Sequence, residues 1–345
     1  SGIDTIWYNW QGINVTYNGP QEIVFNEGVN TIYAWANDSA GNLASTSFTF
    51  TVYNAFSTIW NTTKAGSSEN NQIQLPLDPS GSFDFIVNWG DGNEDSITSW
   101  DQGEKIHTYS SPGIYNIKIG GYIEGWSFSG GGDAQKLLEI NQWGDLHLGN
   151  LGRYFYGCSN LNITAIDVLN LTGTTNLEMA FANCLNLVDV EGMNDWDISK
   201  VTKMSNIFLN AEKFNQNISD WDTCSVTNML GTFQNAKSFN QDIGTWNVSR
   251  VTTMRVAFRG AESFNQNLSK WDVGNVTDMS QTFENAINFN KNIETWNVSN
   301  VVDMSYMFHE ATAFNQSLNN WDVSNVVDMS YMFCRANSFN QDLDS

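Results

Sequence analysis

The stretch WNVSRVTTMRVAFRGAESFNQNLSKW, residues 246–271, decides the fold of this chain. It begins and ends on a tryptophan, and the same 25-residue interval separates all members of the series Trp196, Trp221, Trp246, Trp271, Trp296 and Trp321. A fixed period of this length is typical of a solenoid, in which each repeat forms one coil stacked on the previous one. The sequence therefore predicts an extended stack of coils over its C-terminal part.

Inside the quoted repeat, Met254, Phe258 and Ala261 stand at i, i+4 and i+7, the spacing of one face of a helix. Trp246 and Val248 are apolar at alternate positions, which indicates a brief strand. One short strand and one helical segment in 25 residues fit the length range of leucine-rich repeats. We therefore expect a mainly β chain with short helices, whose solenoid is of the leucine-rich-repeat type.

An asparagine follows a core phenylalanine in every repeat, at Asn215, Asn240, Asn265, Asn290, Asn315 and Asn340. A ladder of stacked amides can satisfy backbone groups of its own coil and of the next one. The alternative is a row of ligand-binding amides, but buried backbone groups must be paired, which favours the structural role. The tryptophans have the same two interpretations, sugar stacking or core packing, and their spacing among core residues favours packing.

The repeat pattern extends on both sides of the tryptophan series. Related apolar positions place the first coil near Leu137, and the sequence stops at Ser345 within a repeat. A solenoid needs a cap on its terminal coil. We therefore expect the apolar residues of the last coil to be covered by further repeats, or by residues 1–53 of a neighbouring subunit; these residues are Met329, Phe333, Phe339 and Leu343.

The composition restricts the classes of partner. The 345 residues include 15 Lys and Arg against 37 Asp and Glu, a net charge of −22. Nucleic acids and anionic membranes are therefore unfavourable partners. No stretch of the sequence approaches the ~18 apolar residues of a membrane span.

Two residue classes suggest covalent modification. Asn-x-Ser/Thr sequons, each a candidate glycosylation site in an exported protein, occur at Asn14, Asn37, Asn61, Asn162, Asn170, Asn217, Asn247, Asn267, Asn275, Asn297 and Asn315. The repeat itself generates several of them, so chance is the alternative. Cys158 and Cys184 occupy the same phase of adjacent coils, about 5 Å apart, and are candidates for a disulfide. The alternative is a pair of small core residues, because later repeats place Ala there.

Two β-rich segments precede the repeats. Residues 1–53 alternate apolar and polar side chains between turn clusters, which predicts a small antiparallel sandwich that lacks an edge strand. Residues 54–125 have further strand patterns punctuated by Gly90-Asp91-Gly92 and Pro112-Gly113, which predicts a second β-sandwich module. The solenoid is expected over residues 126–345, with Gly130-Gly131-Gly132 as the linker to it.

Several motifs carry a resemblance to known families. "FIVNWGDGNED" followed by "HTYSSPGIYNIKI" resembles the polycystic-kidney-disease (PKD) type of Ig-like module. The coils containing "FNQ" and "WDVSNVVDMSYMF" are similar to those of BspA-like leucine-rich-repeat surface proteins. Residues 1–53, with "AWANDSAGN", resemble Ig-like modules of archaeal and bacterial surface proteins. This resemblance implies an exported, non-catalytic role in adhesion or surface architecture, with no catalytic or ligand residues to transfer.

No constellation of residues indicates catalysis. His107, His147 and His309 lie far apart, and none has a second His or Cys at metal-ligand spacing. Asp91, Glu94 and Asp95 are candidates for a Ca²⁺ site, with a solvated acidic loop as the alternative. We expect no catalytic site and no cofactor.

These observations predict an extracellular, cell-surface protein that displays its solenoid for adhesion or protein–protein interaction, toward a protein or glycan on another surface. One alternative is a structural subunit of an extracellular filament or surface layer, which associates head to tail through the last coil. A second alternative is a carbohydrate-binding module that uses exposed aromatic side chains.

Overall fold

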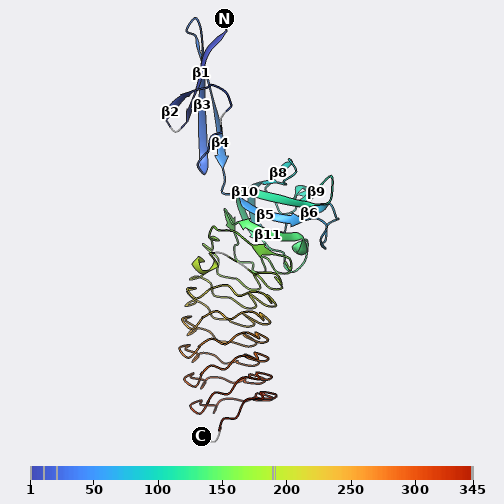
Figure 1. The fold of residues 1–345 in the computed structure, drawn as a ribbon, viewed down its shortest axis with the longest axis vertical. Helices are drawn as coiled ribbons and strands as arrows, with labels where there is room; N and C mark the ends of the chain where they lie inside the picture. The colour runs from blue at the N-terminus through green and yellow to red at the C-terminus, as the bar shows by residue number, and fades with distance from the viewer. Residues whose placement is uncertain (1, 11, 21, 189, 191, 343–345) are drawn as a thin grey trace. The chain divides into compact units, whose positions relative to one another are not determined.

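The computed structural model describes residues 2–10, 12–20, 22–188, 190 and 192–342. Figure 1 shows the chain as a ribbon, and its contacts divide it into two compact units, 1–54 and 55–345. The chain is mainly β, and the helical elements in its described part are three 3-10 turns: Gly103–Lys105, Ala134–Lys136 and Met193–Asp195. None of the described helices is long and apolar enough for a bilayer-spanning segment.

The first unit contains one four-stranded antiparallel sheet in the order β2-β1-β3-β4. The strands are β1 (Ile3–Trp10), β2 (Ile13–Thr16), β3 (Gly28–Asp38) and β4 (Leu43–Val52). The sequence predicted a two-layered sandwich here, but the described residues form only this one layer. Asn30 is accordingly the only buried residue among residues 2–10, 12–20 and 22–54, because no second sheet covers either face.

The second unit begins with a seven-stranded sheet whose path runs β13-β11-β5-β10-β7-β8, with β12 paired to β10. These strands are β5 (Phe56–Asn61), β7 (Leu77–Asn88), β8 (Glu94–Ile97), β10 (Ile114–Trp126), β11 (Leu137–Gln142), β12 (Leu146–His147) and β13 (Asn162–Ile163). A separate pair joins β6 (Gln72–Gln74) to β9 (Ile106–Thr108). Because β11 pairs with β5, the segment 54–125 and the first coils share one sheet and one core.

Residues 137–342, here called the coil stack, continue from this sheet as regularly stacked coils (Figure 1). Single parallel bridges connect equivalent residues of successive coils: Asn176, Lys203, Asn228, Thr253, Asp278, Asp303 and Asp328. The bridging residue lies seven positions after each tryptophan, rather than at the tryptophan where a brief strand was predicted. One backbone column thus holds the coils in register at the 25-residue period.

The helix predicted for residues 254–261 is absent, and a run of linked turns replaces it. The N–H groups of Met254, Val256, Phe258 and Gly260 donate to carbonyls of the next coil, at Asp278, Ser280, Thr282 and Glu284. Intervening N–H groups close four-residue turns within the coil, as from Ala257 to Met254. Because every second N–H points to the next coil, the i to i−4 bonds of an α-helix cannot form.

The core packing predicted from the repeat is confirmed. Trp246 is 3% exposed, and Met254, Phe258 and Phe264 are 0% exposed. Phe258 lies between Phe233 and Phe283, with ring centroids 5.5 Å away on each side. Each buried indole also needs an acceptor, and Nε1 of Trp246 donates to the carbonyl of Ile218 in the previous coil at 3.0 Å. The tryptophan column therefore packs across coils, and from Trp221 onward it also hydrogen-bonds across them.

Asparagine and aspartate side chains cap the corners of each coil. One residue after the tryptophan, Asp272 and Asn297 each accept the backbone N–H two residues further on. The corner needs only a side-chain oxygen acceptor, which explains why both Asp and Asn occur at this position. Gly130 is constrained in a different way. Its φ is 79°, and a Cβ added at this position would lie 2.4 Å from the Tyr156 ring. This glycine permits close packing, so the predicted linker is a packed segment.

The asparagine row forms a ladder between coils. The side-chain oxygen of Asn240 accepts the backbone N–H of Asn265 at 2.9 Å, and that of Asn265 accepts the N–H of Asn290 at 3.0 Å. Asn215, Asn290 and Asn315 make the same bond to the coil that follows them. Each rung thus satisfies a backbone donor of the neighbouring coil.

Removing one rung should destabilise the coil stack without affecting a ligand. We expect Asn265→Ala to lower the free energy of unfolding by about 1–3 kcal/mol, because the N–H of Asn290 loses its acceptor. Urea denaturation measures this, and Asn265→Asp, which keeps an acceptor oxygen, should lose less. Unchanged stability together with loss of binding to a partner would assign the row a functional role instead.

Candidate interaction surface

Comparison of one coil with the next separates scaffold positions from variable ones. Tryptophan, valine, methionine, phenylalanine and alanine recur in the core, whereas four positions of the linked turns vary along the stack. These are the ninth, tenth, thirteenth and fourteenth residues after each tryptophan. We call them the variable face; in the last three described coils they are Ser280, Gln281, Glu284, Asn285, Ser305, Tyr306, His309, Glu310, Ser330, Tyr331, Cys334 and Arg335.

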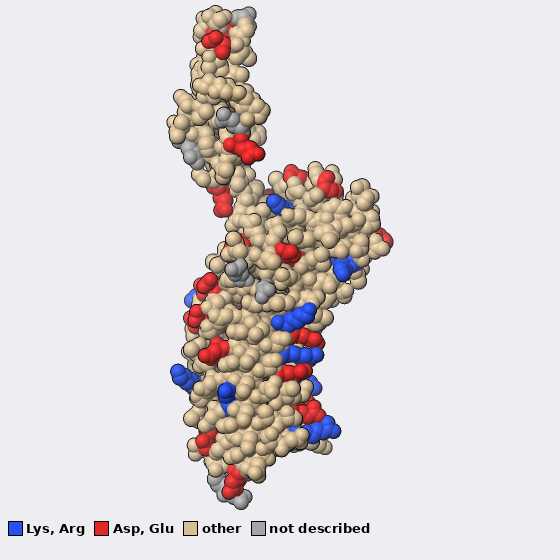
Figure 2. Space-filling view, viewed as in Figure 1, with Lys and Arg blue, Asp and Glu red and all other residues tan. Residues whose placement is uncertain are grey.

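Charged side chains on the variable face interact from coil to coil. Glu284 is placed between Arg259, whose Nε lies 2.9 Å from Oε2, and His309, whose Nδ1 lies 3.5 Å from Oε1. Gln281 also donates to Oε2 at 2.6 Å. Figure 2 shows acidic and basic side chains alternating along one edge of the stack. These cross-coil contacts give the face a fixed pattern of charge.

The same face carries an aromatic pair, of which Tyr306 is partly buried and Tyr331 exposed. Tyr306 and Tyr331 stack with centroids 4.9 Å apart, and Tyr331 is 61% exposed. Beside them, Arg335 donates to Glu310 and thereby lowers the pKa of this carboxyl below its usual value. Exposed tyrosine and arginine side chains are enriched at the centres of protein interfaces. The variable face thus combines a rigid scaffold with side chains suited to contact.

The histidines and acids singled out in the sequence lie in separate environments. His107 stacks on Trp89 at 4.8 Å, and its Nε2 lies 2.9 Å from Asp91. Partial burial acts to raise the pKa of Asp91, but hydrogen bonds from His107 and Asn93 bring it below its usual value. This cluster joins the β7–β8 turn to β9. His147 contacts the carbonyl of Asp145, far from His309 in sequence.

The candidate Ca²⁺ ligands are each paired with a different protein donor. Asp91 contacts His107, Glu94 accepts from Asn88, and Asp95 accepts from the indole of Trp89. Within the described residues, no group of three His, Cys, Asp or Glu side chains is arranged to hold a metal ion. The acidic loop is organised by these local contacts.

The cysteines are free thiols, so the disulfide considered for Cys158 and Cys184 is absent. Both side chains are buried in the core, and the thiol of Cys184 donates to the carbonyl of Phe155. Burial raises the pKa of both thiols, which disfavours the reactive thiolate. They pack at the position that Ala occupies in later coils.

Many of the sequon asparagines cap a backbone corner with their side chains. The side-chain oxygen accepts the N–H of the sequon Ser or Thr at Asn61, Asn170, Asn217, Asn247, Asn267 and Asn297. Asn275 donates to the carbonyl of Ser249, Asn315 belongs to the ladder, and Asn162 lies in β13 with a buried, unbonded oxygen. Asn14 and Asn37 lie on the sheet of the first unit and accept from Asn9 and from the N–H of Thr5. The corner geometry explains why the repeat generates sequons.

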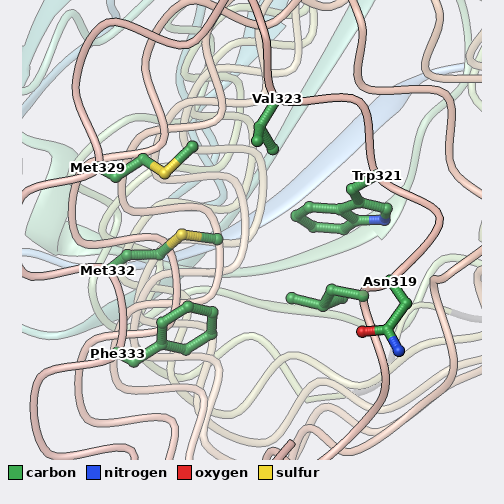
Figure 3. A pocket seen from close by; sticks show the side chains of 7 residues that line it. Asn319, Trp321, Val323, Met329, Met332 and Phe333 are labelled. Carbon is green, nitrogen blue, oxygen red and sulfur yellow. The ribbon is translucent and has the colours of Figure 1, made fainter. Parts of the chain in front are cut away.

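The last described coil has an apolar hollow of about 220 Å³ (Figure 3). Trp321, Val323, Met329, Met332 and Phe333 line it, and Met329 is 40% exposed, whereas its equivalent Met304 is 0% exposed. Among the described residues, the N–H groups of Met329, Tyr331, Phe333 and Arg335 find no backbone acceptor, whereas their equivalents one coil earlier all have one. Of the residues expected here, Leu343 lies outside the described part.

Comparison with known proteins bears on the coil stack. Residues 175–286 and 254–345 match the family model described as "Mycoplasma protein of unknown function, DUF285". This match supports the BspA-like surface protein family. No curated protein and no solved structure matches the chain. The match begins at residue 175 and covers the coils that carry the tryptophan series.

Proposed function

We propose that the protein is a non-catalytic extracellular surface protein that displays its coil stack, a solenoid of the leucine-rich-repeat type, for adhesion or protein–protein interaction. The observation that carries the proposal is the variable face. The core, corner and ladder positions repeat, while four positions of the linked turns vary along the stack and hold the Tyr306–Tyr331 pair. A scaffold with constant packing and changing outward residues is suited to recognition along an extended surface.

The segments before the stack fit the same role. We propose that residues 54–125 derive from a PKD-like module and residues 1–53 from an Ig-like module, both common parts of exported proteins. The support is the local cluster in which Trp89 stacks on His107 and accepts, at its carbonyl, a hydrogen bond from Tyr109. These are the residues of the WGDG and HTY motifs.

The proposal is tested by localisation and adhesion. Antibodies against the chain should label intact cells of its source, and beads coated with the full chain should adhere to the surfaces that those cells contact. Tyr306→Ser with Tyr331→Ser should weaken adhesion about tenfold or more, because aromatic anchors dominate interface energies. The matched control is Val302→Ser with Val327→Ser, in the same two coils, at side chains 44% and 83% exposed.

Adhesion that is lost equally in both variants, or labelling only after cell lysis, would contradict the proposal. The second candidate function is a structural subunit of a filament or surface layer. It is the alternative suggested by the sequence, in which copies associate head to tail. Sizing the native material in the same experiment separates the two, because a filament subunit is recovered as a polymer.

A further inference from the structure

The sheet of the first unit has two chemically different faces. Along each strand, alternate residues point to opposite sides. One side, here called the apolar face, carries Ile6, Trp10, Ile32, Phe48 and Phe50. Phe25 packs on it, with ring centroids 4.4 Å from Trp10 and 4.6 Å from Phe50. This is the side that a second layer of a sandwich would cover.

The opposite side, here called the polar face, consists mainly of Ser, Thr and Asn. The register of the strands places the following residues on it: Thr5, Asn9, Asn14, Thr16, Thr31, Asn37, Ser45, Ser47, Thr49 and Thr51. Two contacts across strands confirm the assignment, from Thr31 to Thr49 at 2.9 Å and from Asn9 to Asn14 at 2.7 Å. Such a surface is typical of the solvent side of a sheet.

Three large aromatic side chains interrupt this polar face: Trp7, Tyr33 and Trp35, here called the aromatic trio. Trp7 and Trp35 lie directly opposite on β1 and β3, with ring centroids 6.4 Å apart and planes within 15°. Tyr33 lies 6.1 Å from Trp35 at 22°, and it is 49% exposed. Because they point away from the apolar face, these rings are not required for its packing, so their presence needs another explanation.

Hydroxyl groups surround the aromatic trio. The strand register sets Thr16 opposite Trp7, Ser47 opposite Tyr33 and Ser45 opposite Trp35. All three hydroxyl residues are exposed, and none of their hydroxyls donates or accepts a hydrogen bond within the described part of the chain. The trio therefore presents nearly parallel rings with unused donors and acceptors beside them.

The charges of this unit define the ligand class. Residues 1–54 contain no Lys or Arg, and their acidic residues, Asp4, Glu22, Glu27 and Asp38, are absent from the polar-face positions named above. An anionic ligand would meet no neutralising cation, which excludes phosphate, sulfate and acidic sugars. A cationic ligand would lack a carboxylate partner on this face. A neutral ligand with apolar faces and hydroxyl edges fits best.

We propose that the aromatic trio binds the pyranose rings of a neutral glycan carried by another molecule or surface. The apolar C–H face of each sugar ring stacks on the indole and phenol rings, which excludes water from both surfaces. The sugar hydroxyls exchange hydrogen bonds with Thr16, Ser45 and Ser47. The site lies outside the coil stack, so it can fail without affecting the function proposed for the variable face.

Full-length protein made in a host without N-glycosylation tests the proposal. Asn14 and Asn37 share the polar face, and such a host ensures that no glycan of the protein's own occupies the trio. An array of neutral hexose and N-acetylhexosamine oligosaccharides should bind the chain. Trp35→Ala and Trp7→Ala should each weaken binding roughly tenfold or more, while Trp35→Phe should recover part of the affinity because it restores a stacking ring.

Val29→Ala is the matched control, because Val29 lies on the same face, is 75% exposed and is absent from the trio. This variant should bind as the parent does, and circular dichroism should show that all variants keep their strands. The proposal is overturned if no neutral glycan binds, if binding survives loss of both tryptophans, or if sialylated glycans or tetramethylammonium bind better than neutral sugars.

Discussion

Replacing Phe258 by alanine should lower the free energy of unfolding by about 3–5 kcal/mol. Phe258 is fully buried and stacks on Phe264 at 4.3 Å within its coil, as well as on Phe233 and Phe283 in the neighbouring coils. Truncation removes these contacts on three sides at once. The cavity cannot collapse easily, because the flanking rings are fixed by their own coils, so the cost should lie in the upper range for a core substitution.

Guanidinium denaturation followed by circular dichroism measures this loss. Tyr331→Ala is the matched control, since this aromatic residue is 61% exposed and should change stability by about 0.5 kcal/mol or less. A Phe258→Ala protein as stable as its parent would show that the phenylalanine column does not carry the stack. A separate unfolding transition of the coils near residue 258 would still agree with the prediction, because repeat arrays can unfold in parts.

The sequence predicted which residues of a coil are buried, but it could not determine the backbone that buries them. Met254, Phe258 and Ala261 fit a helical face, and they are buried together. Successive tight turns place residues on one side at nearly the same spacing as a helix does. The two backbones differ in where the N–H groups point, and that depends on carbonyls 24 residues away, as between Phe258 and Thr282. Local periodicity carries no information about such a partner.

The candidate surfaces were predictable to different degrees. The variable face follows from aligning the repeats with one another, because Tyr306 and His309 occupy positions that change between coils. The aromatic trio needed the strand register, since alternation in β1 alone does not say which of Trp7 and Trp10 faces the polar side. The sandwich predicted for residues 1–53 gave no help with this assignment. In a two-layered module each strand already has one face toward the other layer and one face toward solvent.

The alternation of apolar and polar residues in the sequence also gave no indication of a buried ion pair between the large sheet and the first coils. Lys136 and Asp133 are 0% and 1% exposed, and the Nζ to Oδ1 distance is 3.7 Å. Nζ also donates to the carbonyls of Ser68, Glu69 and Gln72, at 2.9–3.0 Å. Asp133 in turn accepts from the backbone of Ser68 and Gln74. The pair thereby joins the connection between β5 and β6 to the 3-10 turn that starts the coil stack.

Replacing Lys136 by methionine should lower the free energy of unfolding by about 3–5 kcal/mol, because it leaves a buried carboxylate without its counter-charge and three carbonyls without their donor. Methionine retains most of the side-chain volume, so the loss reports the charge and its hydrogen bonds. Burial alone lowers the pKa of Lys136, while Asp133 opposes this shift, as expected where the carboxylate compensates a buried ammonium group.

The matched control is Lys237→Met, which removes an ion pair of 3.1 Å to Glu212 whose side chains are 45% and 48% exposed. Solvent-exposed pairs contribute little, so this variant should change stability by about 0.5 kcal/mol or less. Combining Lys136→Met with Asp133→Asn should cost less than the sum of the two single changes, because the second removes the uncompensated charge that the first creates. Strictly additive losses, or a Lys136→Met variant as stable as Lys237→Met, would show that the buried pair does not hold the sheet and the first coil together.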